Sequence, residues 1–309
     1  MEIFDTGRKI LNFSKPVDHA TMMAALEIFS ERYEELSVTS IGRSILGREI
    51  PLLQRGEGKK KVFYVGAHGG TEGMTAAILL RFVNEYFELY RTGSVVDRVP
   101  MKTLFASRCI CVVPMLNPDG VEYAANGLSE ENPMRERVLA MNGGGEDFHL
   151  WQANARGVDL DGNYNVGFEE RKRLEAALGI LSGAPRHYSG EHPESEPEVG
   201  YLCNFLRFSG EISLALSLHM QGEEVYSPSA DGLLGDRVGQ YIAALCESRL
   251  TGPGIAEARG GFADWFQREF ERPALAVRCV AGEPSPSFSA FPMAYLRIRK
   301  MLFMAPMLV

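Results

Sequence analysis

Hydrophobic residues recur in two alternating patterns along the chain. Continuously apolar runs are typical of buried strands, and they occur at residues 62–67, 109–116, 212–218 and 274–281. Apolar residues at helical spacing predict helices at residues 17–35, 75–90, 197–208 and 234–250, and a C-terminal helix through Met307. Strands that alternate with helices predict an α/β fold, with a mixed, mostly parallel central sheet covered by helices on both faces.

The segments between these elements carry weaker signals. We expect a strand pair near residues 37–56, a Gly-rich, charged excursion over residues 127–150 and a strand near residues 157–160. A long polar loop is expected from there to about Pro193. The chain has 309 residues, 45% of them hydrophobic, and no linker or composition break. It is therefore expected to form a single domain over residues 1–309.

Charge and cysteine content narrow the function classes. The net charge of −8 is moderate and dispersed, which argues against a nucleic-acid partner or an anionic membrane surface. No apolar run reaches the length of a membrane span and no secretory signal is visible, so we expect a cytoplasmic protein. Its five cysteines, odd in number, are expected to be reduced and packed. The sequence does not indicate an oligomeric state.

Two of the strand-like runs deliver a histidine at their ends. His68 follows the first run, with Glu72 four residues on, and His219 follows the third. Side chains at the carboxyl ends of strands meet in one crevice of an open α/β sheet, and two histidines with a glutamate are ligands that a catalytic Zn²⁺ takes. The alternative is that each histidine is a polar cap of its strand.

Arg278 interrupts the last apolar run, at residues 274–281. A buried arginine must be paired or must point into a polar cleft. We therefore expect Arg278 to project into the crevice and to pair with Glu72. The alternative is an arginine at the sheet edge that extends to solvent.

Four sequence blocks, in order, carry a family resemblance. They are LNPDGVEY (116–123), WQANARGVDLDGNYN (151–165), YSGEHPESEPE (188–198) and GGFADWFQREFERPALAV (260–277). The chain resembles the carboxypeptidase A-like zinc peptidases, in particular bacterial members that cut peptides and cell-wall stem peptides. The resemblance implies a zinc cofactor, with His68, Glu72 and His219 as candidate ligands. It also implies substrate contacts from Gln152, Arg156, Asp161 and Asn163.

The matched positions depart from the family pattern at the residues that carry the chemistry. The ligand histidine of the family's H-x-x-E motif aligns with Gly69, one residue after His68, and the mobile tyrosine aligns with Ala256. The Asn-Arg pair that grips the substrate carboxylate becomes Asp161 and Gly162. The glutamate that activates the zinc-bound water aligns with Arg278, and a guanidinium cannot act as a base.

Two hypotheses follow from these departures. In the first, the fold and cleft are retained, hydrolysis is lost, zinc is absent or sub-stoichiometric, and the cleft binds a peptide or cell-wall peptide. In the second, the protein is a zinc peptidase of altered specificity that uses Glu283 or Glu223 as base. Glu283 also has a structural interpretation at the end of its strand, and Glu223 and Glu224 have one in a solvated loop. We favour the first hypothesis because several losses coincide at one site.

Overall fold

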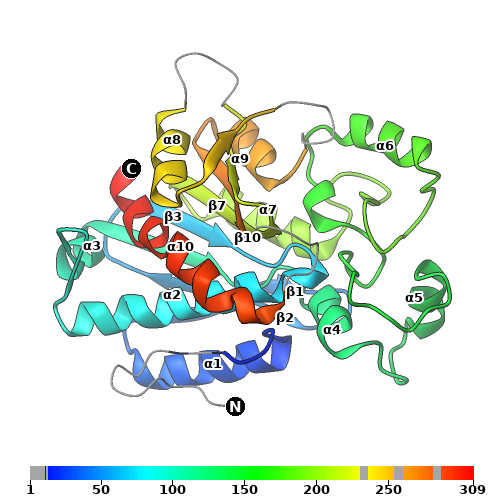
Figure 1. Cartoon of the computed structure of the whole chain (residues 1–309), viewed down its shortest axis with the longest axis horizontal. Helices are drawn as coiled ribbons and strands as arrows, with labels where there is room; N and C mark the ends of the chain where they lie inside the picture. Colours follow the sequence, from blue (N-terminus) through cyan, green and yellow to red (C-terminus); the bar gives the residue numbers. More distant parts are fainter. Residues whose placement is uncertain (1–10, 12, 230–235, 254–259, 281–286) are drawn as a thin grey trace.

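An eight-stranded sheet runs through the centre of the part of the molecule that is described (Figure 1). The computed structural model describes residues 11, 13–229, 236–253, 260–280 and 287–309. The strand order is β1-β2-β6-β3-β7-β10-β8-β9. In that order the strands are Ser37–Arg43, Glu49–Arg55, Arg108–Val113, Lys60–Val65, Ile212–Gln221, Ala274–Val280, Glu224–Tyr226 and Arg249–Thr251.

The four central strands β6, β3, β7 and β10 pair in parallel. Their runs are apolar because both faces are covered. In β3, for example, Val62 and Tyr64 pack on one face, while Phe63 and Val65 pack on the other. The strands β1, β2 and β8 join this parallel core by antiparallel pairing. A separate short hairpin consists of β4 (Val95–Val96) and β5 (Val99–Pro100).

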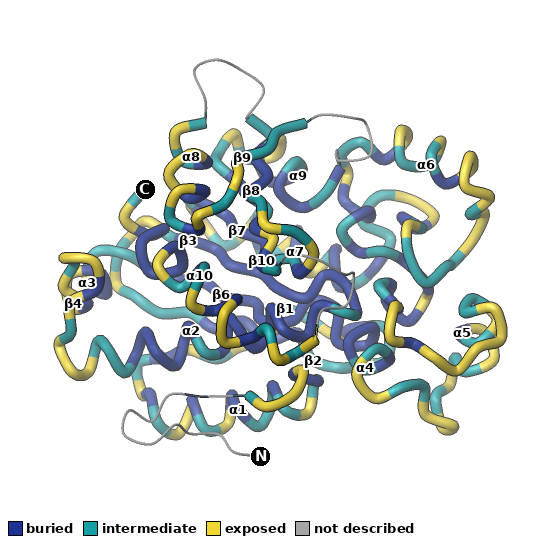
Figure 2. The backbone as a smooth tube through the Cα atoms, viewed as in Figure 1, coloured by how far each residue is buried: buried dark blue, intermediate teal, exposed yellow. Residues whose placement is uncertain are grey.

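Helices cover the two faces unequally (Figures 1 and 2). On the first face, most helical residues of the hydrophobic core come from α1 (His19–Arg32), α2 (Gly73–Arg91), α3 (Met101–Ser107), α8 (Arg237–Leu245) and α10 (Phe291–Met304). On the second face, α7 (Pro197–Phe208) and α9 (Phe262–Phe270) pack against the sheet. Figure 2 shows the sheet as the buried centre, with exposed residues on the outer helices.

The remaining helices lie beside the sheet. They are α4 (Pro118–Asn126), α5 (Arg135–Met141) and α6 (Phe168–Ala177), and the right-hand lobe of Figure 1 contains α5 and α6. A smaller hydrophobic cluster forms here around the buried Trp151, with Tyr123 and Phe148. Four short 3₁₀ helices complete the described structure: Gly70–Glu72, Leu160–Gly162, Phe288–Ala290 and Ala305–Leu308.

The predicted fold class is confirmed, and two local predictions are wrong. The strand expected near residues 157–160 is absent, and Leu160–Gly162 is a 3₁₀ helix. The expected polar loop contains α6, whose sequence FEERKRLEAA has few apolar residues to indicate a helix. The five cysteines are free and buried, as predicted. No helix within the described ranges is long and apolar enough to cross a membrane.

Candidate functional site

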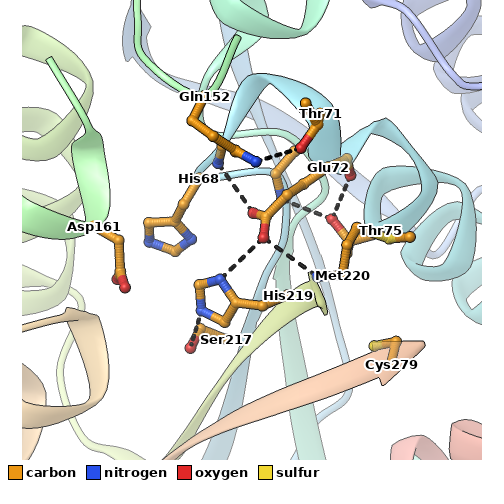
Figure 3. Close-up of polar contacts among 12 residues, drawn as sticks. His68, Thr71, Glu72, Thr75, Gln152, Asp161, Ser217, His219, Met220 and Cys279 are labelled. Carbon is orange, nitrogen blue, oxygen red and sulfur yellow. Dashed lines mark hydrogen bonds and ion pairs between the residues drawn. The ribbon is translucent and has the colours of Figure 1, made fainter. Parts of the chain in front are cut away.

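A pocket of about 310 Å³ lies on the sheet face that carries α9, and it contains the candidate metal ligands. His219 of β7 and Arg278 of β10 are register neighbours in two parallel strands, and both line it. His68 and Glu72 reach the pocket from the loop after β3, and Asp161 reaches it from the 3₁₀ helix at Leu160–Gly162. The predicted convergence of His68, Glu72 and His219 is therefore present (Figure 3).

The loop after β3 takes an unusual path to present His68. Ala67 has a φ of 49°, in the left-handed region that side chains other than glycine seldom adopt. Two hydrogen bonds fix this residue: its N–H donates to Thr75 Oγ1 (2.7 Å), and its carbonyl accepts from Asn117 N–H (2.9 Å). The turn places His68 in the pocket, although the sequence puts it one residue away from the family position.

Glu72 and His219 form the central contact of the site. His219 Nδ1 lies 3.2 Å from Glu72 Oε1, and the same carboxylate accepts from the N–H groups of Gly69 (3.0 Å) and Met220 (3.3 Å). Burial opposes charge on the His219 ring, but the Glu72 carboxylate outweighs it and raises the pKa of His219 to about 9. Burial likewise opposes ionisation of Glu72, and His219 reverses this, so that the carboxyl pKa is lowered. The two groups thus form a buried ion pair.

His68 stands beside this pair in a different state. Its ring centroid is 5.4 Å from that of His219, and its Nε2 lies 2.9 Å from the Tyr164 hydroxyl. Its buried Nδ1 has no hydrogen-bond partner among the described residues. Burial lowers the pKa of His68 to about 4, so the ring is neutral at neutral pH.

Asp161 closes the cluster on the opposite side of the two rings from Glu72 (Figure 3). Its Oδ1 accepts from the N–H of Phe262 (2.9 Å) at the start of α9. Burial would raise the pKa of Asp161, but His219 and His68 lower it to about 2. Asp161 is therefore a fixed negative charge at neutral pH.

The donor types suit zinc, but their arrangement does not enclose an ion. Two donors on one tetrahedral zinc, each at about 2.0–2.1 Å, are about 3.3 Å apart, close to the 3.2 Å between His219 Nδ1 and Glu72 Oε1. The unpaired Nδ1 of His68 is a further candidate donor. However, no group of three or more His, Cys, Asp or Glu side chains in the described ranges is arranged to hold a metal ion. Each Glu72 oxygen already accepts a hydrogen bond from the protein.

The predicted ion pair between Arg278 and Glu72 is wrong. Arg278 lines the pocket, but its Nη1 lies 2.9 Å from Glu224 Oε1, and its side chain is 45% exposed. The short strand β8 pairs with β10 and brings Glu224 alongside Arg278. Glu72 pairs with His219 and Arg278 pairs with Glu224, so each of the two charges that were expected to pair has another partner.

The other predicted residues divide between the pocket and its support. Gln152 lines the pocket, and its amide donates to the Thr71 hydroxyl. Asn163 is buried and braces the loop at residues 189–196, by donating to Ser189 O (2.7 Å) and accepting from Glu196 N–H (3.0 Å). Arg156 lies outside the pocket lining, 3.8 Å from Glu196. Asn163 and Arg156 thus support the surrounding loops.

Only one of the two candidate bases, Glu223, lies within the described residues. Glu223 forms an ion pair with Arg297, its side chain is 54% exposed, and it does not line the pocket. Glu283 and the tyrosine-equivalent Ala256 lie outside the described residues.

Three basic residues that line the pocket were not predicted as site residues from the sequence. Arg171 of α6 and the adjacent pair Arg186 and His187 line the pocket. The polar segment at residues 165–190 is rich in basic residues, which could have indicated an anion-binding role. However, the segment has no hydrophobic periodicity from which the position of these residues relative to the sheet could be predicted.

The parallel sheet, the pocket at its strand ends and the His-Glu-His cluster are those of a metallopeptidase-like protein. The profile of the zinc carboxypeptidase family matches residues 22–273, and the chain belongs to this family. The chain is 27% identical to gamma-D-glutamyl-L-diamino acid endopeptidase 1 of Lysinibacillus sphaericus over 296 residues, which are 93% of this chain and 71% of that protein.

Solved structures share the fold at low sequence identity. The bovine thrombin-activatable fibrinolysis inhibitor has a TM-score of 0.70 and 18% identity, covering 94% of this chain and 96% of that one. The murein-tripeptide amidase MpaA from Escherichia coli O157 has a TM-score of 0.52 and 18% identity, covering 88% of this chain and 91% of that one. Both are similar to this chain in architecture.

Proposed function

We propose that this chain is a zinc carboxypeptidase-like protein that binds a peptide in its retained cleft and does not hydrolyse it at a peptidase's rate. The observation that carries the proposal is Arg278, a pocket-lining arginine next to His219 in the sheet. It stands at the matched position of the family's general base. A guanidinium keeps its proton at any physiological pH, and a cation at this place opposes the binding of Zn²⁺.

Neither Glu72 nor Asp161, the two carboxylates beside the histidines, is a suitable replacement for the general base. A general base works best when its pKa is near the operating pH. The pKa of Glu72 is lowered by His219, and that of Asp161 is held at about 2. Glu224 contacts two arginines, Arg278 and Arg249. Glu224 is thus engaged in two ion pairs, while Glu72 and Asp161 are poor proton acceptors at neutral pH.

The ligand class follows from the relatives. One relative is a gamma-D-glutamyl-L-diamino acid endopeptidase, and one fold neighbour is a murein-tripeptide amidase. We therefore propose a γ-D-glutamyl stem peptide as the class of ligand. The pocket, at about 310 Å³, holds a short segment of such a peptide.

A second candidate function is an active zinc peptidase. The 3.2 Å between His219 Nδ1 and Glu72 Oε1, together with the unpaired Nδ1 of His68, favours it. In that case the ion would be held by His68, Glu72 and His219, and would polarise the peptide carbonyl or a bound water. The base would come from Glu283 or Glu223.

Metal content and turnover separate the two candidates. Protein purified without chelator is expected to contain zinc well below one ion per chain. Hydrolysis of γ-D-glutamyl-L-lysine, with or without added Zn²⁺, is expected to equal that of the control His219→Ala. Calorimetry is expected to show that the wild type binds the same peptide intact.

The first candidate would be contradicted if the wild type held one zinc per chain and cleaved the peptide, and if His219→Ala lost both the zinc and the cleavage. Loss of that cleavage in Glu283→Gln would then identify the base. A wild-type protein that neither binds nor cleaves the peptide would reject both candidates for this class of ligand.

A further inference from the structure

Arg171 and Arg186 line the pocket without a partner of their own. Among the described residues, neither guanidinium forms a hydrogen bond or an ion pair, and both side chains are partly buried. Arg171 acts on Asp159 and Asp161 only as a nearby positive charge, which lowers the pKa of both carboxyl groups. At Asp159 the effect of burial is larger, so the pKa of that group is raised overall. A partly desolvated guanidinium whose N–H groups bond to no carboxylate is suited to an anionic ligand group.

Arg171 occupies the space of a missing side chain. A Cβ added to Gly162 would lie 3.0 Å from Arg171 Cδ and 3.1 Å from its Nη1. The guanidinium therefore lies directly above the backbone of Gly162, which it reaches from α6. The family pattern has an arginine at position 162, and here the side chain of Arg171 lies beside that position instead.

Arg186 is held by a loop that is fixed on both sides. The carbonyl of Pro185 accepts from the N–H groups of Gln152 (2.9 Å) and Ala153 (3.0 Å). After Arg186, His187 has a φ of 70°, and its N–H donates to Asp159 Oδ2 (3.2 Å). A left-handed residue other than glycine persists only where its surroundings enforce it, and such residues cluster at binding sites. These contacts fix the backbone on both sides of Arg186, which lines the pocket.

We propose that Arg171, with Arg186, forms a carboxylate-binding subsite that holds the peptide ligand by one of its carboxylates. This inference rests on the proposed function, because it names how the cleft recognises the peptide. A guanidinium pairs with a carboxylate through two parallel hydrogen bonds, and the pre-formed loop reduces the entropy lost on binding. In γ-D-glutamyl-L-lysine the carboxylate is either the terminal one or the α-carboxylate of the D-glutamate.

The test is calorimetric binding of γ-D-glutamyl-L-lysine and of two analogues, each with one carboxylate converted to an amide. Arg171→Met is expected to weaken binding of the parent peptide by about 10- to 100-fold, the worth of hydrogen bonds to a charged group. Arg173→Met, on the same helix but exposed and outside the pocket, is the matched control and is expected to bind like the wild type. Gly162→Ala is expected to weaken binding because its methyl group displaces Arg171.

The analogues identify the carboxylate. One of the two amide analogues is expected to bind the wild type as weakly as the parent peptide binds Arg171→Met. The same analogue is expected to bind Arg171→Met no more weakly than the parent peptide does. Equal binding by Arg171→Met and Arg173→Met would overturn the subsite and leave the proposed function standing. Failure of the wild type to bind the parent peptide would instead reject the proposed function, and the subsite with it. Circular dichroism of each variant checks that its fold is intact.

Discussion

Glu198 is a buried carboxyl group whose neighbours do not favour its charge. It lies in the first turn of α7 and accepts long hydrogen bonds from Ile45 N–H (3.3 Å) and Asn154 Nδ2 (3.4 Å). Burial raises the pKa of Glu198 to about 8, and the nearby carboxylates of Asp119 and Glu196 add to the effect. Asp119 by contrast has Arg48 Nη1 at 2.6 Å. Glu198 is therefore mostly protonated at neutral pH in the folded protein.

This pKa makes stability depend on pH. Between the unfolded value of 4.5 and about 8, the folded state binds more protons at Glu198 than the unfolded state does. The contribution of Glu198 to the free energy of unfolding is thus fully present below pH 4.5 and falls as the pH rises to 8. We expect Glu198→Gln to be about as stable as the wild type near pH 4.5, and a few kcal/mol more stable at pH 8, at about 1.4 kcal/mol per pKa unit.

Urea unfolding of Glu198→Gln and the wild type across this pH range measures the difference between them. The exposed Glu170→Gln is the control and is expected to show no such trend. A difference between Glu198→Gln and the wild type that does not grow with pH would show that Glu198 is charged in the folded state.

Among the helices and strands, those with a clear hydrophobic pattern were predicted from the sequence. The four buried strands and five of the covering helices, α1, α2, α7, α8 and α10, were predicted because their apolar residues face the core, but α3 and α9 were not predicted. The charged helix α6 gave no such signal, and the pocket arginine that it carries was missed with it. The partner of Arg278 was also mispredicted, because the three-residue strand β8 is too short for its pairing to be read from sequence.

The meeting of three predicted side chains in one pocket also follows from the pattern of strands. Strand ends brought His68, Glu72 and His219 together, as expected from the topology. The sequence did not indicate which groups would pair within the pocket, since that depends on distances of a few ångströms. Nor did it indicate that a left-handed Ala67 brings His68 into the pocket.

The turn at Ala67 gives a prediction at this scale. The left-handed conformation destabilises the folded protein by about 1–2 kcal/mol when the residue is alanine. Glycine avoids this cost, but its unfolded chain is more flexible, so folding costs about 0.5–1 kcal/mol more in conformational entropy. Ala67→Gly is therefore expected to change the free energy of unfolding by less than about 1 kcal/mol. Ala67→Val, which adds a branched side chain to a buried left-handed position, is expected to lose about 2 kcal/mol or more.

Urea unfolding measures both variants at Ala67, with Ala76→Gly as the control. Ala76 is equally buried but lies inside α2, where glycine is expected to cost about 1 kcal/mol. If Ala67→Gly destabilised the protein more than Ala76→Gly does, the positive φ at Ala67 would be wrong.

For the whole molecule, the two tryptophans report on different parts of one predicted domain. Trp265 packs in the core between the sheet and the α7–α9 layer, and Trp151 packs in the smaller cluster beside the sheet. Loops tie the two regions together at the pocket, where Gln152 follows Trp151 and Asp161 accepts from the N–H of Phe262 at the start of α9. Because the pocket is built from both regions, we propose that they unfold together.

Single-tryptophan variants test this cooperativity. Since the chain has two tryptophans, Trp151→Phe leaves Trp265 as the only indole, and Trp265→Phe leaves Trp151. In each variant the fluorescence midpoint in urea is expected to coincide with the midpoint of far-ultraviolet circular dichroism, which reports on all helices and strands. Comparison within one variant cancels the destabilisation caused by the substitution itself. If Trp151 fluorescence changed at a lower urea concentration than the circular dichroism, the lobe beside the sheet would be a separate folding unit, and the pocket would lose one wall before the sheet unfolds.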